Sequence, residues 1–445
     1  MRLGYVGVKM IKKKKLDILI FIGIFFTSIV GAQVFGVSLN KIALIPLEIS
    51  MVLMGRKKIF MLPKKYFPFF LFWCVQIIGS LIALVSFDKY IYAGYQSILA
   101  ANIIQCMLIW IPLGLGLFVY EDKKSIFKST KNAIVLTARI HVVYLILQFL
   151  LWHTVSFDLN GFIFTELFHN FFGSSFNSVF INMGSYGAHT LRTTGLNYDP
   201  AFTSAVMVAG FVFDCSNIIK CLYLVATLMA YSRSGTIAII VIILYKKLKK
   251  ISENNLQINK KKILIFALSI FAGTIAVLYM YRNLEFFRNT IDSSMTRVTS
   301  SLFDYGSIKN GGRHYQYPIY ALYSWLFDLN IFQKIFGVGS RTTGLVFVLS
   351  PYVSQNMSFY PSMLSSAWQI ECDFAAILLG EGLLGYVLYL MILKKLLFSH
   401  ENEMQSYSIG IFAFGFMYAI FLTSFTHVIL LILFVCVKEM NKKTD

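Results

Sequence analysis

Long apolar runs alternate with short polar segments along the whole chain. A run of about 18 or more apolar residues is long enough to cross a bilayer as an α-helix. The pattern therefore predicts an all-α polytopic membrane protein with about 12 transmembrane helices. The predicted spans lie near residues 16–36, 40–55, 67–87, 97–120, 132–154, 200–215, 217–231, 234–246, 263–281, 371–393, 406–420 and 422–437.

Two segments outside the predicted spans are much longer than the rest, residues 155–199 and 282–370. Loops of this length are usually functional or disordered, and the second is too rich in Tyr, Phe and Leu to be disordered. We predict a long, partly helical extracytoplasmic loop before the tenth span. The chain then divides into the first five spans in 1–154, the next four with their preceding outer loop in 155–281, the large loop in 282–370, and the last three spans in 371–445.

The composition agrees with a membrane location. Hydrophobic residues make up 57% of the 445 residues and charged residues only 14%, whereas about a quarter of a soluble protein is charged. The net charge of +19 comes largely from lysine clusters between apolar runs, as the positive-inside rule describes for cytoplasmic loops. We expect a multi-pass protein of the cytoplasmic (inner) membrane with both termini cytoplasmic, surrounded by membrane lipids and without a nucleic-acid partner.

The cysteines of the sequence do not form a pattern typical of a disulfide framework or a zinc site. The six cysteines all fall within or beside apolar segments, and none forms a CxxC pair or a ligand cluster with histidine. Neither a disulfide framework nor a zinc site is therefore predicted. We expect no metal and no cofactor.

Arginine is distributed differently from lysine. If the lysine clusters are cytoplasmic, most arginines fall outside or at the outer membrane face. These are Arg192, Arg233, Arg282, Arg288, Arg297, Arg313 and Arg341. A guanidinium group is a rigid fork of donors that binds phosphate oxygens bidentately, which an ammonium group cannot do. The pattern favours an anionic, phosphate-bearing ligand at this face; lipid headgroup contacts or solvated loop charges are the alternative.

Two of these arginines lie in short segments beside predicted helix starts. Arg192 belongs to "LRTTGLNYDPAF", in which Asp199 and Pro200 predict an N-cap and a first helical residue. The free backbone N–H groups of that helix start are expected to form an anion site at the outer surface. Arg233 belongs to "YSRSG", a very tight turn between two spans, where it either snorkels to the surface or faces a cavity.

Two further arginines flank an aromatic stretch in the large loop. Arg313 and His314 follow two glycines, and Arg341 follows the Gly-x-Gly bend of "FGVGSRTTG". His314 is a candidate base near neutral pH. The stretch between them is either an amphipathic helix at the membrane interface or a platform on which sugar rings stack. Its aromatic residues are Tyr315, Tyr317, Tyr320, Tyr323, Trp325 and Phe327.

Acidic residues stand where the tenth predicted span begins, in "QIECDFAAILLGEGLLG". Glu371 and Asp373 are placed at the outer face and Glu381 deeper in the membrane, where ionisable residues are costly and often functional. A carboxylate here can accept the proton of an acceptor hydroxyl. Pairing with a loop arginine and binding of a divalent cation are the two alternatives.

With these segments placed, the chain resembles the O-antigen and capsular polysaccharide polymerase/ligase superfamily of bacterial membrane enzymes. The resemblance rests on four segments between about residues 191 and 385: "RTTGLNYDPAF", "YSRSGTIAI", "GGRHYQYPIYAL" with "IFGVGSRTTG", and "ECDFAAILLGEGLLG". They are similar to the family's Arg-x-x-Gly-Leu-x-x-(Asp/Glu)-Pro segment, its Ser-Arg turn, its loop arginine followed by a Gly-x-Gly turn, and its acidic late span. The N-terminal third resembles the family only in hydropathy.

The resemblance implies a reaction between two undecaprenyl-diphosphate-linked oligosaccharides at the outer face of the membrane, with no metal. The growing glycan leaves its lipid diphosphate and joins the non-reducing end of a new repeat unit, and a chain-length regulator is a possible partner. Arg192, Arg233 and Arg313, and after them Arg341, are then the candidates for binding the diphosphate. Glu371 or Asp373 would orient or deprotonate the acceptor hydroxyl.

The resemblance leaves other functions open. O-antigen ligases tend to carry a histidine at the start of the late span, where this chain has Glu371 and Asp373. The acidic pair therefore favours a polymerase, although His314 keeps a ligase possible. A lipid-linked oligosaccharide flippase or transporter is the alternative from a different class, but the long segment 282–370 favours an enzyme that binds an acceptor.

Overall fold

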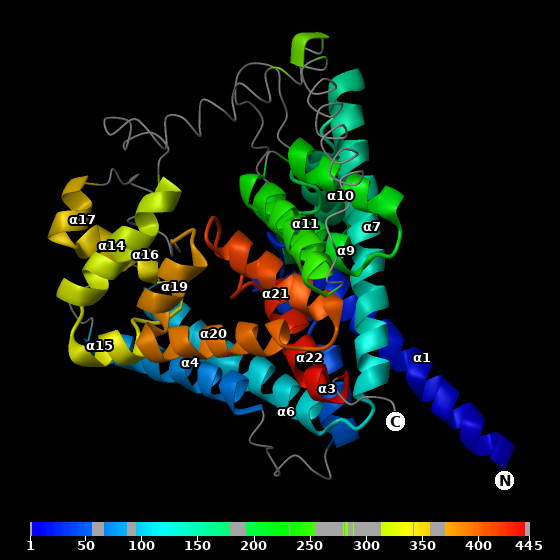
Figure 1. Ribbon diagram of the computed structural model, residues 1–445, viewed down its shortest axis with the longest axis horizontal. Coiled ribbons are helices and arrows are strands. Elements are labelled where there is room, and N and C mark those ends of the chain that lie inside the picture. The colour runs from blue at the N-terminus through cyan, green and yellow to red at the C-terminus, as the bar shows by residue number, and fades with distance from the viewer. Residues whose placement is uncertain are drawn as a thin grey trace.

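The computed structural model of the chain is a bundle of helices with one very small sheet (Figure 1). It describes residues 2–55, 66–86, 95–178, 193–230, 232–253, 313–340, 342–356 and 370–440, with a few residues between 279 and 288. The helices of the N-terminal half are α1 (Arg2–Thr27), α2 (Leu39–Ile42), α3 (Ile45–Gly55), α4 (Phe67–Ser86), α5 (Tyr95–Gln105), α6 (Ile111–Val119), α7 (Lys123–Val155) and α8 (Phe168–Phe172). Those of the C-terminal half are α9 (Pro200–Phe213), α10 (Asn217–Met229), α11 (Arg233–Glu253), α14 (Arg313–Phe327), α15 (Ile331–Phe336), α16 (Thr343–Leu349), α17 (Pro351–Asn356), α19 (Asp373–Gly380), α20 (Gly382–Leu397), α21 (Asn402–Gly415) and α22 (Ser424–Met440).

Several of these helices are suited to a membrane. Among the described residues, three are long and apolar enough to cross a bilayer: Phe67–Val85, Tyr95–Val119 and Lys123–Val155. The second consists of α5, a π-helical turn at Cys106–Trp110, and α6. Shorter apolar helices are Pro200–Phe213, Asn217–Met229 and Ser424–Val437. The chain is therefore compatible with an all-α membrane protein, while the count of about 12 spans stays a prediction; most of the predicted span 263–281 lies outside the described residues.

The first predicted span, 16–36, extends beyond the end of the helix that the structure contains there. Helix α1 stops at Thr27, and the chain continues into strand β1 (Ala32–Val34) and strand β2 (Val37–Ser38). The two strands are antiparallel and joined by Phe35 and Gly36, both with positive φ, as a two-residue hairpin requires. Strand β3 (Phe176–Ser178) pairs with the other edge of β1, giving the order β2-β1-β3. The apolar segment that follows α1 therefore forms strands, although its hydropathy predicted a helix. The local sequence could not indicate this, because the partner strand β3 lies far away in the sequence.

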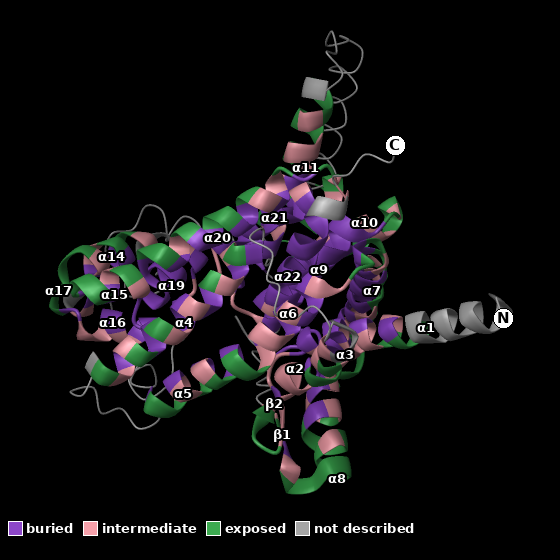
Figure 2. Cartoon of the chain, turned by 90° about the horizontal axis from the view of Figure 1, so that it is seen from below, coloured by how far each residue is buried: buried purple, intermediate pink, exposed green. Residues whose placement is uncertain are grey.

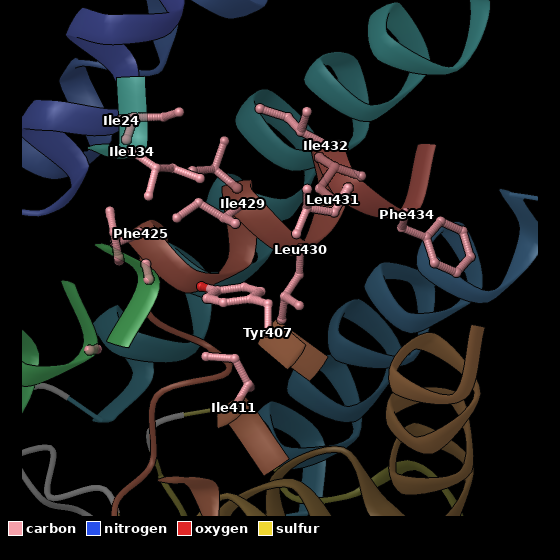
Figure 3. Close-up of a cluster of buried hydrophobic side chains, with 14 of the residues drawn as sticks. Ile24, Ile134, Tyr407, Ile411, Phe425, Ile429, Leu430, Leu431, Ile432 and Phe434 are labelled. Carbon is pink, nitrogen blue, oxygen red and sulfur yellow. The ribbon is translucent and has the colours of Figure 1, made fainter. Parts of the chain in front are cut away.

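The core of the bundle is built around α22, α7 and α9. Helix α22 is buried on every side between Phe425 and Val437, as expected of a helix that is hydrophobic all round. Figure 3 shows Ile24 of α1, Ile134 of α7 and Ile429 of α22 pointing toward one another. Figure 2 shows the buried residues concentrated around α9 and α22.

The predicted tenth span, 371–393, is broken rather than continuous. Helix α19 ends at Gly380, Glu381 adopts φ −111° and ψ 0°, and α20 starts at Gly382. The backbone N–H groups of Val338 and Gly339 donate to the carbonyls of Leu379 and Gly380, both at 2.9 Å. The last carbonyls of α19 are therefore bound by another segment, and this allows the helix to end inside the protein.

Helices α14, α16 and α17 form a second hydrophobic core with α19. Tyr317 and Tyr320 of α14 pack with Phe347 of α16 in this core, and Leu379 closes it from α19. In Figure 1 this group lies at one end of α4 and α20, away from α1. The described part of the predicted loop 282–370 is thus mainly helical, and Tyr317, Tyr320 and Phe347 serve as core residues.

Candidate functional site

The loop between α21 and α22 connects the starts of two distant helices. Its Tyr418 Oη donates to Oδ2 of Asp199, the residue before α9, at 3.2 Å. Its Phe421 N donates to Oδ1 of Asp373, the first residue of α19, at 3.0 Å. We call the starts of α9, α11 and α19 together with this loop the junction.

Asp199 caps α9, as the Asp-Pro pair predicted. Its backbone is extended, Pro200 occupies the first turn, and its Oδ1 accepts from Ala201 N at 2.7 Å. The prediction of an anion site at this helix start is wrong in one respect. Pro200 has no N–H, and the carboxylate of Asp199 already occupies the donor that an external anion would use.

The segment that follows Arg192 is held by buried polar contacts. Gln148 Oε1 of α7 accepts from Gly195 N at 2.9 Å, and Asn160 Nδ2 donates to Thr194 Oγ1 at 2.9 Å. Arg192 itself lies outside the described residues. Thr193, its neighbour, is fully buried and donates through Oγ1 to Met229 O at the end of α10, at 2.9 Å.

That contact brings the "RTTG" segment to the "YSRSG" turn. Helix α10 ends at Met229 and α11 begins at Arg233, which confirms the short turn. Gly235 N donates to Ser232 Oγ at 3.3 Å, the contact of an N-terminal cap. Arg233 is partly buried at the first position of α11. The structure therefore places the chain next to Arg192 beside the turn that carries Arg233.

The two acidic residues of the junction have different surroundings. Asp373 is 1% exposed, and both of its oxygens accept from Phe421 N. Glu371 is only partly buried. Asp373 thus anchors the loop between α21 and α22, whereas Glu371 is the more accessible carboxylate.

The turn around Arg341 also reaches this acidic segment. Arg341 lies outside the described residues, but Thr343, two positions later, accepts through Oγ1 from Ile370 N at 3.3 Å. Ile370 is the neighbour of Glu371. Arg313 and His314 are the first residues of α14, which packs against α19, and their side chains lie outside the described part of the structure.

A second polar cluster, which we did not foresee, surrounds Glu381. Its Oε1 accepts from the Ser340 hydroxyl and from Gln76 Nε2 of α4, the latter at 3.1 Å. Asn102 of α5 donates to the Ser340 carbonyl. Glu381 is fully buried, and its Oε2 has no hydrogen-bond partner among the described residues. The cluster fixes the turn that ends at Ser340, directly before Arg341.

Other buried polar groups hold the bundle together. Arg139 of α7 binds Asp214 at the end of α9 through Nε–Oδ2 at 2.9 Å and Nη2–Oδ1 at 3.1 Å. His141 Nε2 lies 2.8 Å from Ser28 Oγ at the end of α1. In the part of the chain that the structure describes, no group of three or more His, Cys, Asp or Glu residues could hold a metal ion.

The sequence singled out Arg192, Arg233, Asp199, Glu371 and Asp373, and the structure brings their chain segments to one junction. Tyr418 was not foreseen, because nothing in its local sequence marks it; only the return of the chain between α21 and α22 brings it to Asp199. Comparison with known proteins adds no relative: no protein-family model matches the chain, and no curated protein matches it significantly.

Proposed function

We propose that the protein is a polysaccharide repeat-unit polymerase of the cytoplasmic membrane. It transfers the growing glycan from undecaprenyl diphosphate to the non-reducing end of another undecaprenyl-diphosphate-linked repeat unit at the outer face. The observation that carries the proposal is the junction: Tyr418 and Phe421 bind Asp199 and Asp373, so an arginine-bearing segment and an acidic segment far apart in sequence lie around one loop.

The arginine side of the junction suits a diphosphate leaving group. When the bond between the sugar C1 and the phosphate oxygen breaks, negative charge develops on the diphosphate, and guanidinium donors stabilise it. Arg192 and Arg233 are assigned to this role because Thr193 and Met229 hold their chain segments together. Arg313 and Arg341 are assigned to it from the α14–α16 side.

The acidic side suits the acceptor. A new bond forms between the acceptor hydroxyl oxygen and C1, and the hydroxyl proton passes to a carboxylate. Glu371 is assigned this role because it is only partly buried, whereas the carboxylate of Asp373 already accepts a hydrogen bond from Phe421 N. Asp373 then acts by positioning the start of α19, and His314 remains a candidate base only if Glu371 proves dispensable.

The test is reconstitution of the purified full-length chain in liposomes with undecaprenyl-diphosphate-linked repeat units isolated from the source strain. A ladder of lipid-linked glycans that grows by one repeat unit is the expected product. If protein that is shown to be folded produces no ladder, the proposal is overturned. Transfer of single units to lipid A core or protein would indicate a ligase, and movement of labelled substrate across the bilayer without chain growth would indicate a flippase.

Deletion of the gene gives an independent readout in cells. A polymerase mutant should lose the ladder of surface glycan and still display single repeat units. Loss of all surface glycan instead would favour the ligase or the flippase. Complementation with Arg313→Lys separates guanidinium geometry from charge, because lysine keeps the charge and loses the bidentate fork.

A further inference from the structure

Helix α14 is apolar on two faces. Its inner face supplies Tyr317 and Tyr320 to the second core. Its outer face carries Ile319, which is 64% exposed, with Leu322 and Leu326 on the same stripe. A helix with two apolar faces is normally covered on both, and among the described residues nothing covers the outer face of α14.

Helix α15 extends this exposed apolar surface. Ile331, Phe332 and Ile335 are exposed on it, and Phe332 lines a groove of about 350 Å³ together with Leu81, Ile82 and Val85 at the end of α4. Helix α4 is one of the helices apolar enough to span a membrane. The exposed face of α14 and α15 therefore continues onto a helix whose own exposed side chains, Val85 among them, are suited to lipid (Figures 1 and 2).

Polar groups of the α14–α15 hairpin bind one another. Lys334 Nζ donates to Leu326 O at 2.7 Å, and Trp325 Nε1 donates to Lys334 O at 3.0 Å. Asn330 and Gln333 form a reciprocal capping box at the start of α15. Internal pairing of this kind lowers the cost of placing polar groups where water is scarce, while Asp328 between the two helices stays exposed, as suits the interface rather than the bilayer centre.

We propose that the α14–α15 hairpin lies in the lipid bilayer at its interface, with Ile319, Leu322 and Phe332 among lipid acyl chains. The hairpin and the end of α4 form one lipid-facing surface, and the groove between them takes hydrocarbon of membrane lipid. This part of the segment 282–370 is then an interfacial element of the membrane domain and not a water-exposed loop. The inference does not depend on the chemistry proposed above.

Site-directed spin labelling of the full chain tests this placement. Cys74, Cys215 and Cys221, which are not buried, are replaced by Ser, and single labels are attached at Ile319→Cys, Leu322→Cys and Phe332→Cys. The control is Lys124→Cys at the start of α7, because Lys124 is exposed beside the charged residues Asp122 and Lys123 and lies away from the hairpin. The protein is reconstituted alone in phosphatidylethanolamine/phosphatidylglycerol liposomes, and collisions with oxygen and with a water-soluble nickel chelate are measured.

Labels on the hairpin should collide readily with oxygen and at least about fivefold less with the nickel chelate than the Lys124 label, because a polar chelate is excluded from hydrocarbon. Ready collision with the chelate at Leu322 and Phe332 would place the hairpin in water and overturn the proposal. Low collision with both reagents would also overturn it, since protein rather than lipid would then cover the face. Because three positions on two helices are labelled, the test still holds if one variant does not fold.

Discussion

The two ends of the helix bundle hold their carboxylates in different ways. At the junction, Asp199 and Asp373 accept hydrogen bonds from neutral donors, a tyrosine hydroxyl and backbone N–H groups. At the other end, defined by the starts of α7 and α21 and the end of α9, Asp214 binds Arg139 and Glu403 binds Lys131 at 2.9 Å. Helices α9 and α21 each run from one end to the other.

The second end also gathers lysines from distant segments. Lys123 and Lys395 both lie over the Tyr66 ring, 5.9 and 5.5 Å from its centroid, and Lys249 of α11 donates to Asn402 beside α21. These lysines belong to the clusters that the sequence assigned to one side of the membrane. The second end is thus held by ion pairs, whereas Asp199 and Asp373 at the junction are held by hydrogen bonds from neutral donors.

The largest expected effect is on catalysis at the junction. Glu371→Gln keeps the size of the side chain and removes its ability to take a proton, so the rate of glycan extension should fall about 100-fold or more. The matched variant at the other end, Glu403→Gln, should change the rate less than about twofold, because the partly exposed Lys131–Glu403 pair lies away from the junction. Rates are measured in the liposome ladder assay with equal amounts of folded protein. If Glu371→Gln is fully active, Glu371 takes no part in the mechanism. If the melting temperature of the variant falls instead, Glu371 belongs to a structural ion pair.

The next effect is on stability at the opposite end. Arg139→Met leaves Asp214, whose side chain is 1% exposed, without its cation, and the free energy of unfolding should fall by about 2 kcal/mol, less than for a fully buried pair because Arg139 is partly exposed. Unfolding is followed by tryptophan fluorescence in detergent. The double variant Arg139→Met/Asp214→Asn should recover most of the loss. Equal losses in the single and double variants would mean that packing of Arg139, and not its charge, matters.

Arg233→Lys should have a smaller effect than Glu371→Gln. Lysine keeps the positive charge and loses the bidentate fork, so we expect the extension rate to fall about tenfold, or ~1.4 kcal/mol in activation free energy. The control is Lys131→Arg at the other end, which should leave the rate unchanged. A wild-type rate for Arg233→Lys would show that charge alone is sufficient at this position.

The smallest effect is expected from one hydroxyl. Tyr418→Phe removes the hydrogen bond to Asp199 and should lower the free energy of unfolding by about 1 kcal/mol. Asp199→Asn keeps an acceptor for Ala201 N, and its Nδ2 can donate to the Tyr418 hydroxyl oxygen in place of accepting from it, so it should cost less. Both are measured by the same unfolding assay. If Tyr418→Phe were as stable as the parent, the loop between α21 and α22 would be held by Phe421 and Asp373 alone.

Local sequence predicted the features that depend on neighbouring residues. The Asp-Pro pair indicated the start of α9, and Ser-Arg-Ser indicated the turn before α11, because capping and turn preferences act over a few residues. Hydropathy indicated helices over most predicted spans. It failed at β1, where pairing with β3 replaces helix, and at Glu381, where the turn at Val338 and Gly339 breaks the tenth span.

The sequence by itself determined the membrane-protein class, most helices and the residue types available for binding an anion. Only the tertiary structure decided which residues from distant segments lie in contact. Tyr418 reaches Asp199, Thr193 reaches Met229, and Glu381 binds Gln76 and Ser340, whose carbonyl accepts from Asn102. Apolar periodicity shows which residues leave water, but not which helix lies next to which. Polar contacts between distant segments follow from packing, in which each buried donor or acceptor must find a partner in three dimensions.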